Sequence, residues 1–127
     1  MRKAMIGVVA AVGLLAAGGG VALGGAKQLF PLNINAAGRF ASGGLAETHN
    51  TADTMQYAEC GTNGTTGFCT LRDTAGTYYS CFTTDAANLA VIRSMSPDGY
   101  FSISWDAAGT CTYVLSYASS RSAVKLP

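Results

Sequence analysis

Four cysteines constrain the fold of this chain more than any other feature of its sequence. They are Cys60, Cys69, Cys81 and Cys111. An even number of cysteines in so short a stretch is typical of small domains crosslinked by disulfides in an oxidising compartment. Structural zinc sites usually bring two ligands within about four residues of each other, whereas the closest pair here is Cys60 and Cys69. The cysteines therefore predict two disulfides and no metal site.

More than one pairing of these cysteines is possible. Cys60 and Cys69 flank a turn-rich loop, residues 61–67, and are therefore expected on adjacent strands of a hairpin. Cys81 is then left to join Cys111, which ties the strand before a predicted helix to the last predicted strand. We favour this pairing and expect each bridge to stabilise the fold by about 2–4 kcal/mol.

The N-terminus has the pattern of an export signal. Residues 1–3 form a short basic start, and residues 4–26 contain no charged side chain, as in a secretory signal peptide. Gly24 and Ala26 are small residues suited to cleavage before Lys27. The segment is also long enough to remain as a membrane anchor, since a spanning helix needs about 20 apolar residues, but its many glycines disfavour a helix. In both cases the rest of the chain is expected on the exported side.

Composition limits the number of domains and the kinds of partner. A chain of 127 residues accommodates one domain. Only 12% of the residues are charged and the net charge is +1, so we expect no nucleic-acid partner. We divide the chain into a signal peptide or anchor (1–26), a flexible spacer rich in Gly, Ala and Asn (27–54) and a folded domain (55–127).

Hydrophobic alternation and turn-forming residues in the folded domain predict five strands and one helix. The spacing of Leu89, Ile92 and Met95 indicates the amphipathic helix, and Thr84 is its expected N-cap. In chain order, the predicted elements are strands 55–60, 68–72 and 77–82, helix 85–95, and strands 100–105 and 110–117. The order β-β-β-α-β-β predicts an α+β fold, in which one helix packs on a small antiparallel sheet of about five strands.

The sequence offers few residues for catalysis. His49 is the single histidine, and in a spacer nothing would hold it within hydrogen-bond reach of a nucleophile. Asp73, Asp98 and Asp106 each precede a glycine in a predicted turn, where aspartate binds its own backbone. We therefore expect no catalytic residue, no cofactor and no metal.

Aromatic residues gather on the predicted strands, where they can form either a core or a contact surface. Phe101, Trp105 and Tyr113 lie on the apolar side of the alternating pattern and are expected in the core; the alternation of residues 110–117 places Tyr117 on the same side. Tyr79 and Tyr100 break the alternation and are candidate surface contacts. A row of rings on an exposed sheet face could stack on sugar rings or bind a partner protein.

These features favour an exported, non-enzymatic binding or structural module of the cell envelope, cell surface or extracellular space. Its expected partner is a protein or a cell-surface glycan, and it would contact a membrane only through residues 4–26 if these are retained. Asn63 is a further candidate surface residue, because it begins a sequon for N-glycosylation. The alternative function is a small secreted hydrolase, or a protease inhibitor that acts through the loop between Cys60 and Cys69.

Overall fold

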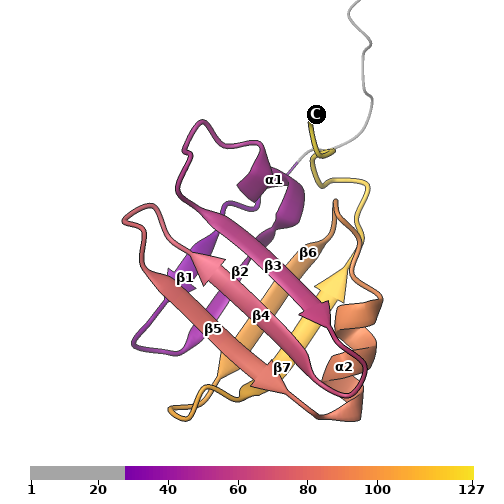
Figure 1. Ribbon diagram of the computed structural model, residues 1–127. Coiled ribbons are helices and arrows are strands. Elements are labelled where there is room, and N and C mark those ends of the chain that lie inside the picture. Colours follow the sequence, from indigo (N-terminus) through magenta and orange to yellow (C-terminus); the bar gives the residue numbers. More distant parts are fainter. Residues whose placement is uncertain (1–27) are drawn as a thin grey trace, which may run out of the picture.

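Two antiparallel β-sheets pack face to face in the computed structural model, which describes residues 28–127 (Figure 1). The predicted signal peptide, residues 1–26, lies outside the described residues. One sheet has four strands in the order β1-β2-β6-β7, and the other has three in the order β3-β4-β5. The elements are β1 (Asn33–Asn35), β2 (Phe40–Gly44), α1 (Leu45–His49), β3 (Tyr57–Thr62), β4 (Gly67–Arg72), β5 (Tyr78–Thr83), α2 (Ala86–Arg93), β6 (Tyr100–Trp105) and β7 (Cys111–Tyr117).

The predicted fold is confirmed in part. The strands are antiparallel, the five predicted strands are present as β3 to β7, and the chain carries two disulfides. The prediction of a single sheet with one helix differs from the structure, because the strands divide between two sheets and a second, short helix, α1, follows β2. In Figure 1 the strands of the front sheet cross those of the sheet behind, as in orthogonally packed sandwiches.

The extra strands come from the stretch that was expected to be a flexible spacer. Residues 33–49 form β1, β2 and α1, and β2 pairs with β1 on one side and with β6 on the other. The sequence of β2 is Phe-Ala-Ser-Gly-Gly, which lacks the large alternating side chains by which strands are recognised. Small residues are required there: a Cβ at Gly43 would lie 3.0 Å from the backbone of Leu32.

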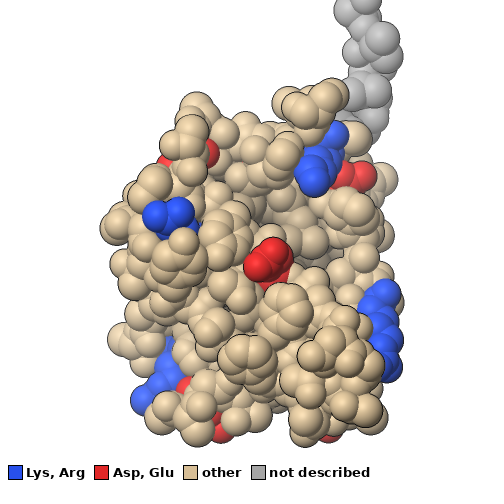
Figure 2. Space-filling model, in the orientation of Figure 1, with Lys and Arg blue, Asp and Glu red and all other residues tan. Residues whose placement is uncertain are grey.

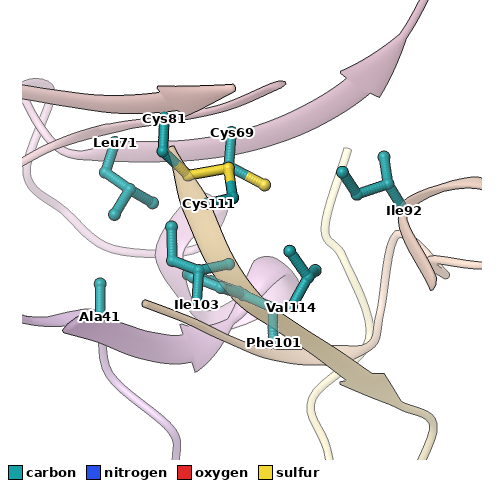
Figure 3. Packing of buried hydrophobic residues seen from close by; sticks show 9 residues of the cluster. All are labelled: Ala41, Cys69, Leu71, Cys81, Ile92, Phe101, Ile103, Cys111 and Val114. Carbon is teal, nitrogen blue, oxygen red and sulfur yellow. A yellow bond between two sulfur atoms is a disulfide. The ribbon is translucent and has the colours of Figure 1, made fainter. Parts of the chain in front are cut away.

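The core lies between the two sheets (Figure 3). Its buried members from both sheets and from α2 are Ala41, Cys69, Leu71, Cys81, Ile92, Phe101, Ile103, Cys111 and Val114. Phe101 was expected in the core and is buried, and Trp105 is half-buried and packs against the same cluster. The clean alternation of β6 thus identified its inner side correctly.

Strand β7 departs from the predicted alternation. Ser104 lies opposite Tyr113 and Trp105 lies opposite Cys111, so Thr112 is an extra residue that forms a β-bulge. A bulge shifts every later side chain to the opposite face. Val114 is therefore buried, and Tyr113, which was expected in the core, is 49% exposed.

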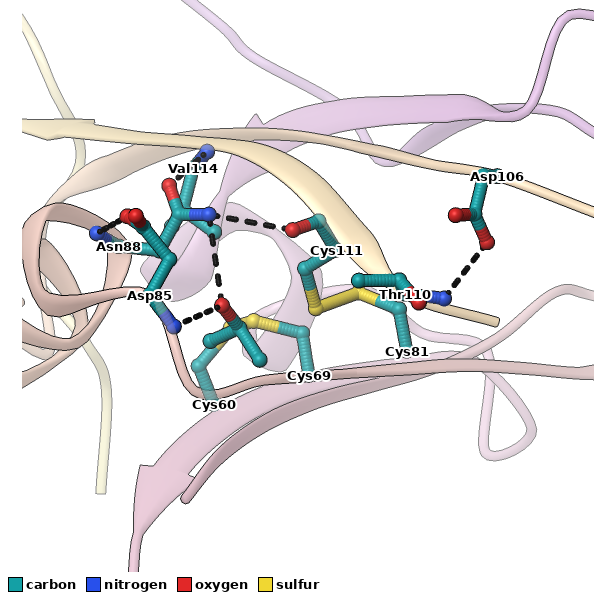
Figure 4. Close-up of a disulfide and its surroundings, with 10 residues drawn as sticks. Cys60, Cys69, Cys81, Asp85, Asn88, Asp106, Thr110, Cys111 and Val114 are labelled. Carbon is teal, nitrogen blue, oxygen red and sulfur yellow. Dashed lines mark hydrogen bonds between the residues drawn. A yellow bond between two sulfur atoms is a disulfide. The ribbon is translucent and has the colours of Figure 1, made fainter. Parts of the chain in front are cut away.

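Both predicted disulfides are confirmed (Figure 4). Cys60–Cys69 joins directly opposed residues of β3 and β4 within the three-stranded sheet. Cys81–Cys111 joins β5 to β7 and so links the two sheets through the core.

Helix α2 covers the edge of β7 and is fixed there by Asn88. The helix is shorter than predicted, and its N-cap is Asp85 rather than Thr84: the Asp85 carboxylate accepts a hydrogen bond from Asn88 N at 2.9 Å. The buried amide of Asn88 donates to Cys111 O at 3.1 Å and accepts from Val114 N at 3.1 Å (Figure 4). One side chain thereby satisfies two backbone groups next to the bulge.

The same turn closes one hairpin in each sheet. Asp73 to Thr77 joins β4 to β5, and Asp106 to Thr110 joins β6 to β7. In each turn the carboxylate of the aspartate accepts two backbone hydrogen bonds of 2.9 Å, and the glycine has a positive φ. These bonds lower the pKa of Asp73 and Asp106, the largest cause being the backbone N–H of the threonine.

Candidate functional site

A cavity of about 290 Å³ lies beside α1 and contains His49. The imidazole Nε2 of His49 lies 3.1 Å from the carbonyl oxygen of Leu126, with which it is hydrogen-bonded. Thr48, another lining residue, donates its hydroxyl to Gly44 O at 2.8 Å. Asp53 accepts from the backbone N–H groups of two nearby residues, at 2.8 and 3.0 Å. These three polar side chains of the cavity are thus bonded to backbone.

The aspartates of the predicted turns do not form a carboxylate pair for acid–base catalysis. Asp73 and Asp106 hold their own turns, as expected. Asp98 was expected to bind its own turn but accepts from Lys125 N at 2.8 Å, which fastens the C-terminal segment. Within residues 28–127, no cluster of three or more His, Cys, Asp or Glu side chains is arranged to hold a metal ion.

The loop between Cys60 and Cys69 is shorter than the sequence indicated. Strands β3 and β4 extend into it and leave a tight turn of residues 63–66, closed by a 3.0 Å bond from Asn63 N to Thr66 O. Asn63 is exposed, as expected of a sequon residue. The side chain of Arg93, in α2, donates a hydrogen bond to Gly64 O and so holds the turn against the helix.

The outer side of the four-stranded sheet carries exposed aromatic side chains. We call this surface the tyrosine face. Its strand register and alternation place the following residues on it: Asn33, Asn35, Phe40, Ser42, Tyr100, Ser102, Ser104, Tyr113, Leu115 and Tyr117. Tyr113 is 49% exposed, Tyr117 41% and Phe40 38%.

The rings of the tyrosine face form two groups at opposite ends of the strands. Tyr100 and Tyr117 are opposed residues whose ring centroids lie 4.8 Å apart, and Phe30 packs edge-on against Tyr100 at 5.1 Å. Phe40 and Tyr113 both lie opposite Ser104 at the other end. Tyr113 and Tyr117 are four residues apart on β7, which corresponds to about 14 Å along a strand.

Short polar side chains lie between these two groups of rings. Ser102 pairs with Ser42 on one side and Leu115 on the other, and Asn33 lies opposite Ser42. Strands β1, β2, β6 and β7 contain no charged residue. The strands of the tyrosine face therefore carry rings, hydroxyls and amides and no charged side chain.

One end of the tyrosine face is closed by Glu47 of α1. Gly44 is the outer residue of β2 opposite Tyr100, and a Cβ there would overlap the Glu47 carboxylate. Glu47 is buried and accepts from Ala123 N at 3.2 Å. Within the described chain its other oxygen, Oε2, has no hydrogen-bond partner, and neither does the buried hydroxyl of Ser122.

The outer side of the three-stranded sheet also exposes aromatic residues. Figure 2 views this side, where charged atoms are few. Glu59 and Arg72 are the only charged residues of β3, β4 and β5. The Arg72 guanidinium lies 4.9 Å from the centre of the Tyr78 ring, and the ring of Tyr57 lies 6.1 Å from that of Tyr78. Burial is the largest cause that raises the pKa of Tyr57.

Of the two candidate tyrosines, the structure brings one to the surface site. Tyr100 lies on the tyrosine face and is half-buried by its ring partners. Tyr79 lies on the inner side of β5, where it packs against the core and donates to Asp73 Oδ2 at 3.3 Å. Burial, followed by the Asp73 charge, raises the pKa of Tyr79.

Sequence reasoning missed Phe40, Tyr113 and Tyr117 as surface residues. Phe40 lay in the expected spacer, and the two tyrosines were assigned to the apolar side of β7. One signal pointed the other way: Val114 lies between Tyr113 and Leu115, so both faces of the strand carry apolar residues and the alternation does not define the inner side.

No helix within residues 28–127 is long and apolar enough to cross a membrane. The two disulfides indicate an oxidising, extracellular type of environment. Comparison of the chain with protein-family models, curated proteins and solved structures found no match.

Proposed function

We propose that this protein is an exported, non-enzymatic binding module and that the tyrosine face is its contact surface. Export is supported by the N-terminal pattern of a basic start and a long uncharged segment. It is supported independently by the disulfides, which persist in oxidising compartments.

The observation that carries the proposal is the exposure of Tyr113 and Tyr117 on a sheet face whose strands contain no charged residue. Large exposed rings are costly in water and are enriched in binding surfaces, because a buried tyrosine contributes large contact area at low entropic cost. β6, the strand beside them, is paired on both sides. The Cys81–Cys111 bridge holds β7 through the core, and Asn88 holds its other edge. The backbone that carries the rings is therefore held in place.

The arrangement of polar groups favours binding over catalysis. A general base must reach its nucleophile through a hydrogen bond, and the His49 Nε2 is bonded to the Leu126 carbonyl. A protease inhibitor needs a protruding loop that can enter an active site. The turn after β3 is short and is pinned by Arg93.

The test is co-sedimentation of the purified exported protein with cell-envelope fractions of the cells that produce it. We expect the wild-type protein to sediment with the envelope and a Tyr113→Ser/Tyr117→Ser variant to remain in the supernatant. These residues are exposed, so the variant is expected to fold normally, which circular dichroism checks.

The matched control is Tyr78→Ser/Phe82→Ser on the other sheet, where the two rings are 60% and 58% exposed. This control should sediment as the wild type does. Equal retention of both variants, or no retention of the wild-type protein, would contradict the proposed role of the tyrosine face.

A further inference from the structure

We propose that the ligand of the tyrosine face is an uncharged polysaccharide chain that lies along β6 and β7. This inference rests on the proposed function, because it names the chemical class of the partner bound by the same surface. Three properties of the face support it: the placement of its rings, the chemistry of the groups between them and the absence of charge from its strands.

The rings are placed to contact an extended ligand at two points. Tyr100 and Tyr117 form one stacked group, with centroids 4.8 Å apart and planes inclined by 32°, and Tyr117, the more exposed of the two, offers its free side to a ligand. Tyr113 lies four residues from Tyr117 on the same strand, about 14 Å away along the strand. The negative face of an aromatic ring attracts C–H groups that carry partial positive charge, and a pyranose ring presents such C–H groups on its flat sides. A short run of sugars can therefore bridge the two ends.

The groups between the rings match sugar hydroxyls. Ser42, Ser102 and Ser104 lie across β2 and β6, with Asn33 beside them on β1. Serine hydroxyls and asparagine amides both donate and accept hydrogen bonds, as sugar hydroxyls do. Ser42 and Ser102 are also short, so a sugar chain can approach the backbone of β2 and β6 between the two groups of rings.

The absence of charged residues from the four strands selects among ligands that stack on rings. Single-stranded nucleic acids also stack on exposed rings, but their sites pair the rings with a positively charged groove. No Lys or Arg lies in β1, β2, β6 or β7. A polymer that carries phosphate or carboxylate groups would therefore lose hydration on binding and gain no ion pair with these strands in return. A neutral glycan requires no counter-charge.

The opposite face of the molecule lacks this combination. There the Tyr78 ring is covered by the guanidinium of Arg72, and Glu59 lies on the same side of the sheet. Phe68 is folded over Gly61, since a Cβ at Gly61 would lie 2.9 Å from the Phe68 ring. The three-stranded sheet therefore supplies control residues that are at least as exposed as Tyr113 and Tyr117 but lie beside charged side chains of the same strands.

The first experiment measures affinity for defined polymers. Purified wild-type protein is run in native gels that contain cellulose derivatives, soluble chitin or laminarin as neutral probes, and polygalacturonate or dextran sulfate as charged probes. We expect retardation by at least one neutral polymer and by neither charged one. Tyr113→Ser/Tyr117→Ser should weaken that binding at least tenfold, and Tyr78→Ser/Phe82→Ser should leave it unchanged. Retardation by the charged polymers alone, or by none, would overturn the inference.

The second experiment separates failure of this inference from failure of the proposed function. Envelope fractions are treated with periodate, which oxidises the vicinal diols of sugars, or with proteinase K, and co-sedimentation is repeated. Loss of binding after periodate but not after protease supports a glycan ligand. Loss after protease but not after periodate identifies a protein partner, which refutes the glycan while the tyrosine face keeps its proposed role. No binding to untreated envelope refutes both.

Discussion

The two outer faces of the sandwich both expose aromatic rings, but the rings have different surroundings. On the three-stranded sheet, Tyr78 is contacted by Arg72 and by the edge of Tyr57. On the four-stranded sheet, Tyr113 lies opposite the small side chain of Ser104 and stands apart from the stacked pair of Tyr100 and Tyr117. The exposed fractions of the rings alone would rank the three-stranded face first, since Tyr78 and Phe82 are more exposed than Tyr113 and Tyr117. Rings are paired on both faces, but only on the three-stranded face does a charged residue of the strands, Arg72, contact a ring.

The different surroundings of the rings on the two faces also show how a small sandwich can present two unlike surfaces. Both faces rest on one core, and both are closed by the same Asp-x-Ala-Gly-Thr turn. The chemistry of each surface is therefore set by the outward residues of its strands, which contribute little to the core and can vary without loss of the fold.

The largest expected effect comes from breaking the link between the faces. Replacing Cys81 and Cys111 by alanine opens a bridge with a sequence separation of 30, and loop entropy predicts a loss of about 3.5 kcal/mol. Replacing Cys60 and Cys69 opens a bridge with a separation of 9 inside one sheet, with a smaller predicted loss of about 2.5 kcal/mol. Urea denaturation measures both. A larger loss for the bridge within the sheet would reverse this ranking.

The second-largest loss of stability is expected from a change at the edge of β7. Asn88→Ala removes the partner of both Cys111 O and Val114 N, and buried backbone groups left unpaired cost about 1–3 kcal/mol. Asn33→Ala, on an exposed position of β1, is the control and should change stability by less than about 0.5 kcal/mol. Equal midpoints of urea denaturation for the two variants would mean that Asn88 does not hold this edge.

A smaller effect is expected on the three-stranded face. Arg72→Gln removes the cation from the Tyr78 ring, an interaction worth about 0.5–1 kcal/mol at an exposed site. We expect a small drop in stability and no change in binding by the tyrosine face. Arg121→Gln, a change at an exposed residue of the C-terminal segment, serves as the reference. Altered binding in Arg72→Gln would show that the two faces are not independent.

The smallest expected effect is on the stability of the fold at low pH. The pKa of Asp73 and Asp106 is lowered in the folded protein by backbone hydrogen bonds. Carboxylates with a lowered pKa stabilise the fold above their usual pKa, and this stability is lost as the pH falls below about 4. Between about pH 4 and pH 2, the free energy of unfolding of Asp73→Asn/Asp106→Asn should therefore fall less steeply than that of the wild-type protein. Parallel curves for the variant and the wild type would contradict this assignment.

The elements with strong local signals were predictable from the sequence. Residues 100–105 alternate cleanly, and the prediction matched β6 in both bounds. The positions of Asp and Gly identified the two repeated turns, and the loop between Cys60 and Cys69 indicated the first disulfide. In these cases the physical cause lies within a few residues of its effect.

The remaining features depend on partners that are distant in the chain. β2 is a strand because it pairs with β6, which lies much later in the chain. The small residues of β2 show no alternation from which that pairing could be predicted. The bulge at Thr112 depends on the register against β6. Because alternation was extended through the bulge, Tyr113 and Tyr117 were assigned to the inner side. Tyr100 was the one residue of the tyrosine face that sequence reasoning identified.

The side chain of Asn88 has a consequence for the solubility of the protein. An open strand edge is a template on which another chain can add a strand and begin an aggregate. Asn88 occupies two hydrogen-bonding positions on the β7 edge, and the other edge of the same sheet, β1, is only three residues long. A surface with exposed tyrosines can therefore be presented at high protein concentration, because neither edge of its sheet offers a neighbouring molecule a long strand to extend.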